Sequence, residues 1–298
     1  MTGQAETVKN ICLNKWRGEY EADERLNEFD CNFEKWLQQI PEENHSTVLT
    51  LIANLEYYSH RETNKWLKDL HKQLLENKNI SDENTIYAFI KSKDGGTNSS
   101  NDYWTEYKAI NNINKNICLE NMDVIDDADL PFIDNFVFID DFSGTGKSFI
   151  NELKKNTSRY NGKNVYFITI NIMISATRKI ECYCRENNIK IIILSEFRQD
   201  KTFSRNLFDD NSKAKEEITT MSEDLIIPES EIMGFKKSQA LVAFYNNTPN
   251  NTLGFIRYDT KKYNSIFPRR NDIVPGWINM KRARMARKTT NYNSKAEE

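Results

Sequence analysis

Apolar residues in the first third of the chain recur at steps of three and four, the period of a helix with one buried face. The repeat comprises Phe29, Phe33, Trp36, Leu37 and Ile40, then Leu49, Leu51, Ile52, Leu55 and Tyr58, then Trp66, Leu67, Leu70, Leu74 and Leu75. Pro41 ends the first helix, and Ser46 with Thr47 suits the start of the second. The pattern therefore predicts helices throughout residues 1–80.

Short apolar runs alternate with helical patterns between residues 85 and 195. The runs are 85–91 (TIYAFIK), 136–139 (FVFI), 165–172 (VYFITINI) and 189–194 (IKIIIL), and helices are predicted near 103–113, 148–155 and 176–187. The run at 136–139 has no polar position, as in a parallel strand that is buried on both faces. The alternation predicts an α/β fold with a parallel sheet and crossover helices.

The last third of the chain is less regular. Residues 196–237 are polar and mixed, which predicts a helical insertion or a lid, and residues 240–245 and 253–258 predict two late strands. The segment after Pro275 is basic (KRARMARK at 281–288), and we expect it to be a mobile tail. The predicted domains are a helical N-terminal extension (1–80), an α/β domain (81–272) and a basic flexible tail (273–298).

Ligands of parallel sheets bind beyond the carboxyl ends of the strands. The loops at 92–101, 140–148, 173–175 and 246–251 each follow a predicted strand. We therefore expect these loops to share one edge of the molecule.

Composition narrows the classes of protein to consider. The formal net charge of −3 is unlike that of a protein that coats nucleic acid. The five cysteines are irregularly spaced and the three histidines all lie in the first third, which disfavours a disulfide framework and a zinc site. The chain has no apolar run of membrane-spanning length and no apolar signal core at its start, so we expect a cytoplasmic protein without membrane contact.

The segment 137–149, VFIDDFSGTGKSF, carries the sharpest chemical signal. A buried strand delivers two adjacent carboxylates, Asp140 and Asp141, and a loop of small residues and a helix follow. Small residues let backbone N–H groups approach a phosphate closely, and the start of a helix favours negative charge. The hydroxyls of Ser143, Thr145 and Ser148 can add hydrogen bonds, and Lys147 can add positive charge. The two acids can accept hydrogen bonds from the hydroxyls of a sugar that carries this phosphate.

The ending GTGKS also resembles the end of a P-loop, which makes an ATPase an alternative. A P-loop requires a second glycine five positions before the Gly of its G-K-[ST] ending. That position is Asp141, whose carboxylate would repel a triphosphate.

The pattern D-D-x-x-x-T-G-x-[ST] after an apolar strand resembles the 5-phosphoribosyl-1-pyrophosphate (PRPP) signature of type I phosphoribosyltransferases. Asp140, Asp141, Thr145, Gly146 and Ser148 occupy its defining positions. The resemblance implies the parallel-sheet type I phosphoribosyltransferase fold. It also implies that the two acids bind the ribose hydroxyls directly or through Mg²⁺, which makes them candidate catalytic and metal-binding residues.

By the same resemblance, the loop from Ser143 through Gly144 and Lys147 to Ser148 holds the 5-phosphate. One position departs from the family: purine-salvage members have an Asp directly before the Thr-Gly, where this chain has Gly144. A carboxylate-assisted reaction with a purine is therefore in doubt.

Two further loops are candidates for substrate contacts. In the family an earlier loop binds pyrophosphate, and here the residues in its place are Lys91, Lys93, Gly95 and Gly96, although a solvated turn is an equal alternative. Ser99, Ser100 and Tyr103 are candidates for a flap, and Arg198, Lys201 and Arg205 are candidates for a lid or for solvated charges. In the loop 246–252, Asn247 and Asn250 can recognise a base or a phosphate, or can cap a turn around Pro249.

The stretch LVAFYNNTPNNT (241–252) is similar to the C-terminal block of phosphoribosyltransferase-like effectors of prokaryotic conflict systems, that is, anti-phage and retron-type loci. This similarity implies a transferase that uses PRPP or a ribose 5-phosphate nucleotide, with a nucleotide, nucleic acid or protein as target and with partner proteins of a defence system. The alternatives are a non-catalytic nucleotide sensor, which Gly144 favours, and the P-loop-like ATPase. A homo-oligomer stays open.

Overall fold

The computed structural model describes residues 3–17, 23–76, 79–91 and 98–270, together with Met280 and Arg284. Four helices open the chain, namely α1 (Gly3–Trp16), α2 (Glu24–Leu37), α3 (His45–Ala53) and α4 (His60–Leu75). The predicted helices are therefore present, and α4 begins in a capping box in which Ser59 and Glu62 bond each other's backbone N–H. None of the helices among the described residues is long and apolar enough to cross a bilayer.

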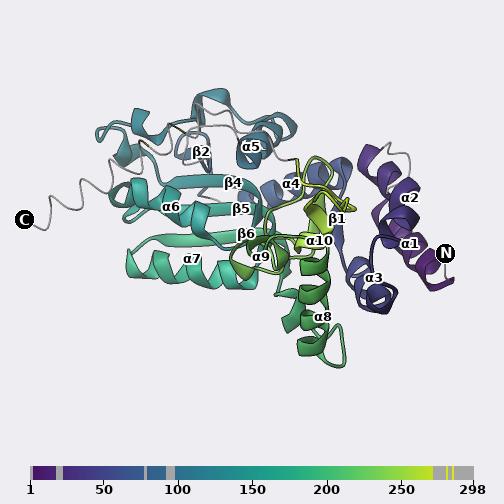
Figure 1. Cartoon of the computed structure of the whole chain (residues 1–298). Helices are drawn as coiled ribbons and strands as arrows, with labels where there is room; N and C mark the ends of the chain where they lie inside the picture. Colours follow the sequence, from purple (N-terminus) through teal and green to yellow (C-terminus); the bar gives the residue numbers. More distant parts are fainter. Residues whose placement is uncertain are drawn as a thin grey trace, which may run out of the picture.

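A five-stranded sheet forms the centre of the molecule (Figure 1). Its strands are β2 (Thr85–Phe89), β3 (Cys118–Leu119), β4 (Asn135–Ser143), β5 (Asn164–Met173) and β6 (Lys190–Gln199). All neighbouring pairs are parallel and the order is β3-β2-β4-β5-β6. This arrangement confirms the predicted α/β fold with a parallel sheet.

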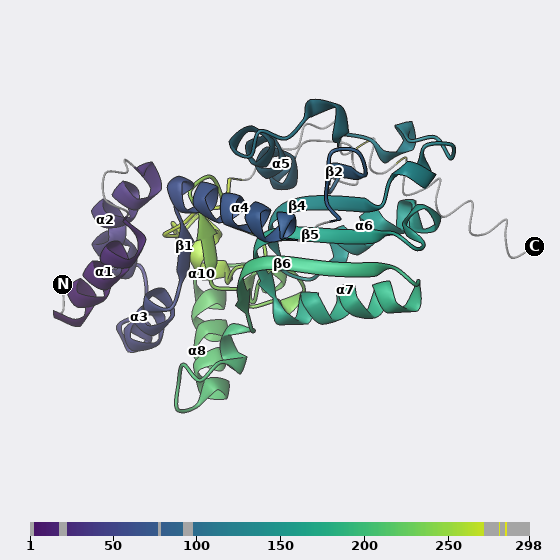
Figure 2. The same ribbon diagram turned by 180° about the vertical axis from the view of Figure 1, so that it is seen from behind.

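Helices cover both faces of this sheet, as Figures 1 and 2 show from opposite sides. One face carries α4 and α5 (Ser99–Ile110), and the other carries α6 (Lys147–Lys155) and α7 (Ile174–Glu186). Every residue of β4 is buried, which explains its unbroken apolar run. Strand β4 extends through Ser143, so both predicted acids belong to the strand itself.

A second apolar core joins the N-terminal helices to the last part of the chain. It contains Phe29 and Phe33 of α2, Ile218 of α8 (Asn211–Asp224), and Phe255 and Phe267. Residues 196–237, predicted to be a helical insertion or a lid, contain the end of β6 and the helices α8 and α9 (Glu229–Ile232), and α8 packs into this core. The division into domains at residues 80 and 272 stays a prediction, and the tail 273–298 lies outside the described residues except for Met280 and Arg284.

Two segments differ from the prediction. Residues Glu56–Tyr58 form a strand, β1, that pairs in parallel with β7 (Val242–Phe244) in a separate two-stranded sheet, whereas a helix was expected. Residues 253–258 contain the helix α10 (Gly254–Arg257) and not a strand. Both segments are short and largely buried, and burial hides the periodicity that would separate a helix from a strand.

The remaining short helices are 3-10 turns: Glu42–Asn44, Lys115–Ile117, Met122–Val124, Leu130–Phe132, Thr157–Tyr160, Thr202–Ser204 and Phe235–Lys237. The last of these matters for the site, because Phe235 lines the pocket described below.

Candidate functional site

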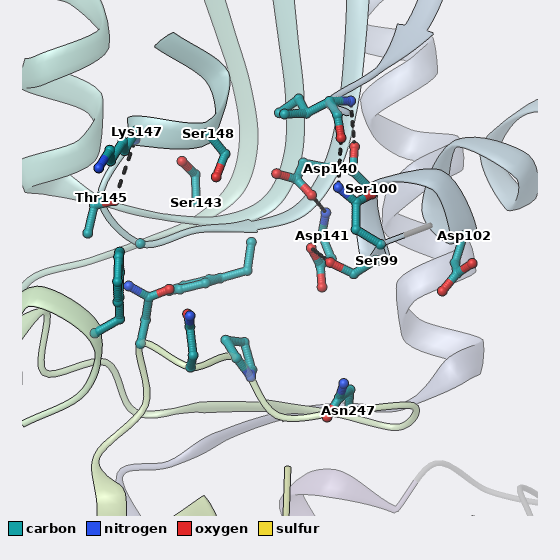
Figure 3. A pocket seen from close by; sticks show the side chains of 18 of the residues that line it. Ser99, Ser100, Asp102, Asp140, Asp141, Ser143, Thr145, Lys147, Ser148 and Asn247 are labelled. Atoms are coloured by element: carbon teal, nitrogen blue, oxygen red, sulfur yellow. Dashed lines mark hydrogen bonds between the residues drawn. The ribbon is translucent and has the colours of Figure 1, made fainter. Parts of the chain in front are cut away.

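A pocket of about 820 Å³ lies at the carboxyl ends of β2 and β4. Its wall comes from four places: the end of β2, the first turn of α5, the segment from Asp140 to α6, and the loop 246–251 with its neighbours Phe235, Arg269 and Arg270. Figure 3 shows the side chains that face it. The predicted loops 140–148 and 246–251 therefore meet at one cavity, whereas residues 173–175 do not line it.

Asp140 and Asp141 lie side by side on the pocket wall, each only 8% exposed. The backbone N–H of Asp141 donates to Oδ1 of Asp140 at 3.0 Å, and the Ser99 hydroxyl donates to Oδ1 of Asp141 at 3.0 Å. Burial, and next the neighbouring Asp141 charge, raises the pKa of Asp140 well above its usual value. The Asp140 carboxyl therefore holds a proton more readily than an exposed carboxyl would.

A third carboxylate adds to this negative region. Asp102, in the first turn of α5, also lines the pocket, and burial together with the charge of Asp141 raises its pKa. Sequence reasoning missed Asp102, because nothing in its local sequence marks it as close to the pair at 140–141.

The turn after the acids has the form of an anion site. Gly146 adopts φ +70°, and a Cβ there would come within 3.0 Å of Ile180 and 3.1 Å of the Ala176 carbonyl oxygen. Gly146 is thus required by both its backbone conformation and its packing. Helix α6 begins directly after it, so its first N–H groups have no partners within the helix and can bind an anion. Lys147 and Ser148 are exposed at this helix start.

The side chains of this turn face the same cavity (Figure 3). The Ser143 hydroxyl is largely buried at the end of β4, and the Thr145 hydroxyl accepts a long hydrogen bond of 3.5 Å from the Lys147 backbone. Both hydroxyls can reorient toward a bound oxyanion. The structure thus brings together the predicted residues from Ser143 to Ser148.

Gly144 packs against the loop on the opposite wall. A Cβ at Gly144 would lie 2.1 Å from Cγ of Asn251, an impossible distance, so only glycine fits while Asn251 holds its position. The Asn251 amide is fixed by a 3.0 Å hydrogen bond that it donates to the Ser238 hydroxyl. The side chain of Asn251 therefore fills the place into which an acid at position 144 would extend.

The first turn of α5 is anchored to the sheet and is not a flap, which corrects the prediction for Ser99, Ser100 and Tyr103. Ser100 is 2% exposed, and its hydroxyl donates to the Ile139 carbonyl oxygen at 2.6 Å and accepts from the Ile90 backbone at 2.9 Å. These bonds join the ends of β2 and β4. The Ile90 and Ile139 backbone groups that Ser100 bonds are buried, so these bonds hold the start of α5 in place.

The loop 246–251 is held from outside the pocket by an arginine of α2. The buried Arg25 guanidinium donates to the Phe244 carbonyl oxygen, to the Thr248 hydroxyl (2.9 Å) and to the Pro268 carbonyl oxygen (3.0 Å). Asn247 accepts a 3.0 Å bond from the Arg270 backbone. The wall that carries Asn247 thus depends on residues far away in the sequence.

Basic side chains line the remaining parts of the pocket. Lys91 follows β2 as expected, and Lys155 bonds the carboxylate of Glu152 at 2.7 Å. Arg269 and Arg270 enter from the C-terminal segment and were not predicted. The side chain of Arg269 donates to the Thr248 carbonyl oxygen at 2.7 Å.

The remaining candidate residues from the sequence differ in whether they line the pocket. Asn250 lines the pocket and its backbone carbonyl accepts from Phe235, whereas Lys93, Gly95 and Gly96 lie outside the described residues. The lid candidates Arg198, Lys201 and Arg205 do not line the pocket. No group of three or more His, Cys, Asp or Glu side chains is placed for a metal in the part of the chain that the structure describes.

Comparison with solved structures gives weak partial matches. A Helicobacter pylori xanthine-guanine-hypoxanthine phosphoribosyltransferase is 13% identical, with a TM-score of 0.32, over 49% of this chain and 89% of that chain. A hypothetical protein from Neisseria gonorrhoeae with bound ppGpp is 11% identical, with a TM-score of 0.32, over 49% of this chain and 85% of that chain. At this level of similarity, neither says what this chain binds. No curated protein matches the chain.

Comparison with sequence models of protein families gives a match over a much larger part of the chain. The sequence model of the PRTase-CE family matches residues 33–269, a range that includes the sheet, every residue that lines the pocket except Arg270, and most of the second core. The chain therefore belongs to the PRTase-CE family, the phosphoribosyltransferases of conflict systems.

Proposed function

We propose that the pocket binds the ribose 5-phosphate group of PRPP or of a nucleotide, and that the protein is a phosphoribosyltransferase acting in prokaryotic anti-phage defence. One observation carries the proposal. Two adjacent buried acids and the start of α6 lie on the same wall of one pocket, in the order that a sugar and its 5-phosphate require. The proposed phosphate ligands are the backbone and side chains of Ser143 to Ser148.

The proposed reaction breaks the bond from the anomeric carbon to pyrophosphate, and an acceptor nucleophile bonds to that carbon. Negative charge grows on the leaving group, so positioned positive charges are the main need. Lys91 and Lys155 lie on the pocket wall on the side of β2 and α6 and can serve this role. The unpredicted Arg269 and Arg270 lie beside the loop that carries Asn247 and Asn250, where the acceptor would bind.

The donor set at the acids suits Mg²⁺. This ion prefers oxygen ligands and is commonly held by one or two carboxylates together with phosphate oxygens of the substrate. Asp140 and Asp141 would provide these carboxylates, and when bound the ion would supply positive charge to the departing pyrophosphate. Because Asp140 has a raised pKa, Mg²⁺ affinity is expected to increase as the pH rises.

Titration calorimetry with PRPP and Mg²⁺, followed by an assay for pyrophosphate release, tests the proposal. Binding should be lost in Asp141→Asn and kept in Asp82→Asn, which makes the same change at an exposed acid outside the pocket. A wild-type protein that binds neither PRPP nor a nucleotide would refute the proposal. Binding without turnover with any acceptor would support the binding site but not the transferase reaction.

A sensor without catalysis is the second candidate, and the packing of Gly144 against Asn251 favours it. No acid can enter at that position to assist an acceptor base while Asn251 remains. Tight nucleotide binding with no pyrophosphate release would identify this case. The ATPase alternative requires ATP hydrolysis that is lost in Lys147→Ala, and Asp141 stands against it because its carboxylate lines the same pocket.

A further inference from the structure

The two edge strands of the central sheet differ sharply in length. One edge strand, β3, has two residues, whereas the other, β6, has ten. Figure 2 shows β6 as the outermost strand on its side of the sheet. Within the described part of the chain no strand pairs with its outer edge. A long strand with free backbone groups is a template for pairing with another strand.

The sequence of β6 lacks two of the features that block such pairing in other proteins, although it does carry exposed charges. It contains no proline or glycine, and its pairing with β5 keeps the same register before and after Glu196, the one residue of the strand that is not paired. Its first half, Ile191–Leu194, consists of four aliphatic residues that all keep partial exposure. A strand of this kind is expected to have a partner that covers it.

The charges on β6 indicate what this partner is. Lys190 and Glu196 are exposed, lie on the same face of the strand, and have no ion-pair partner among the residues that the structure describes. Two copies of β6 that pair antiparallel around Ile193 set Lys190 of each copy opposite Glu196 of the other. The same register sets Ile192 opposite Leu194, so apolar residues face apolar residues.

Alternative registers fit less well. A shift of the axis to Leu194 sets Lys190 opposite Arg198, which brings like charges together. A shift by one position sets residues on one face of the strand opposite residues on the other face of its partner. Of these registers, the one around Ile193 sets unlike charges opposite each other and apolar residues opposite each other.

We propose that two copies of this chain form a homodimer in which their β6 strands pair antiparallel around Ile193, giving one continuous ten-stranded sheet. Antiparallel pairing sends the carboxyl ends of the two sets of strands in opposite directions. The two pockets then open at opposite ends of the dimer, and each is built from a single chain. Dimer formation can thus be measured independently of ligand binding.

Charge reversal with rescue tests the proposal on the full chain. Sedimentation equilibrium should find a dimer, and Lys190→Glu or Glu196→Lys alone should raise its dissociation constant about ten-fold or more, since each reversal changes two cross-strand pairs. The double variant Lys190→Glu/Glu196→Lys should restore the wild-type constant. Lys35→Glu makes the same charge change at an exposed position on α2 and should leave the constant unchanged.

Three results would overturn the proposal. A wild-type protein that stays monomeric would show that the β6 strands of two copies do not pair. A dimer that is insensitive to both single reversals would place the interface elsewhere. A dimer weakened by the single reversals but not restored in the double variant would exclude this register. All three positions that are changed are exposed in the monomer, and circular dichroism of each variant verifies that it is folded.

Discussion

The contact between Gly144 and Asn251 makes a prediction that can be worked out from the structure. In Gly144→Ala the added methyl group would lie 2.1 Å from Cγ, 2.2 Å from Nδ2 and 2.5 Å from Oδ1 of Asn251. Asn251 is 8% exposed and bonded to Ser238, so it cannot move aside without breaking that bond. Overpacking costs about 1–3 kcal/mol and the lost hydrogen bond about 1 kcal/mol, so we expect Gly144→Ala to lower the unfolding free energy by about 2–4 kcal/mol.

The second variant, Asn251→Ala, removes all three atoms of this clash. Alone it should cost about 1 kcal/mol, because it deletes one hydrogen bond while the Ser238 hydroxyl keeps its 3.0 Å bond to the Asn251 carbonyl oxygen. With the clash gone, the alanine at position 144 has space. The double variant should then cost about as much as Asn251→Ala alone, at least about 2 kcal/mol less than the sum of the single variants.

Urea unfolding of the four proteins measures this coupling, provided that the slope with denaturant is the same in each. The control is Gly3→Ala, where an added methyl group meets nothing within 4 Å, and this variant should be nearly neutral. A double variant whose loss equals the sum of the single losses would refute the reasoning, and so would a neutral Gly144→Ala.

Three further predictions concern buried ionisable groups. Arg25→Met leaves three acceptors without their donor and should lower the unfolding free energy by about 3 kcal/mol or more in urea titrations. Folded Asp140 has a pKa above that of the unfolded chain, so between the two values the folded state binds more protons and stability falls as pH rises. Asp140→Asn should therefore melt higher than wild type without ligand, by a margin that grows with pH, and should lose stabilisation by Mg²⁺ with PRPP. Burial raises the pKa of both Cys12 and Cys184 to about 12, so their thiols should not react with iodoacetamide in the native protein. Peptide mapping should find the exposed Cys31 alkylated in the native protein, and Cys12 and Cys184 alkylated only after unfolding.

The central motif was predictable because its chemistry is local. Apolar residues that run without a polar position indicate a buried parallel strand, and the glycines and hydroxyls after Asp141 indicate a turn that ends in a helix. The structure has β4, the turn and α6 in this order. Parallel order also places the ends of β2 and β4 together, which correctly predicts that Lys91 lies near the acids.

The opposite wall was predictable only in part, because it depends on contacts between distant residues. Asn247 and Asn250 were expected from their loop, but nothing near Arg25 in the sequence indicates that it bonds Thr248, 223 positions later. Arg269 and Arg270 line the pocket only because the C-terminal segment returns to it, and that path is set by the packing of Phe267 on Phe29. The β1–β7 pair was missed for the same reason, since a three-residue strand has no pattern of its own.

The pocket lies between two apolar cores, and this placement bears on how the protein could respond to a ligand. The wall with Asp140 and Asp141 belongs to the sheet, whereas the wall with Asn247 is held by Arg25 of the N-terminal helices. A ligand that contacts both walls binds best when the walls are at one particular distance from each other. Its binding therefore favours the conformation in which the two cores hold that distance. By the same linkage, whatever shifts the N-terminal helices alters affinity at the pocket. In this family member the N-terminal helix α2 is thus physically connected to the site, through hydrogen bonds that start at one buried arginine.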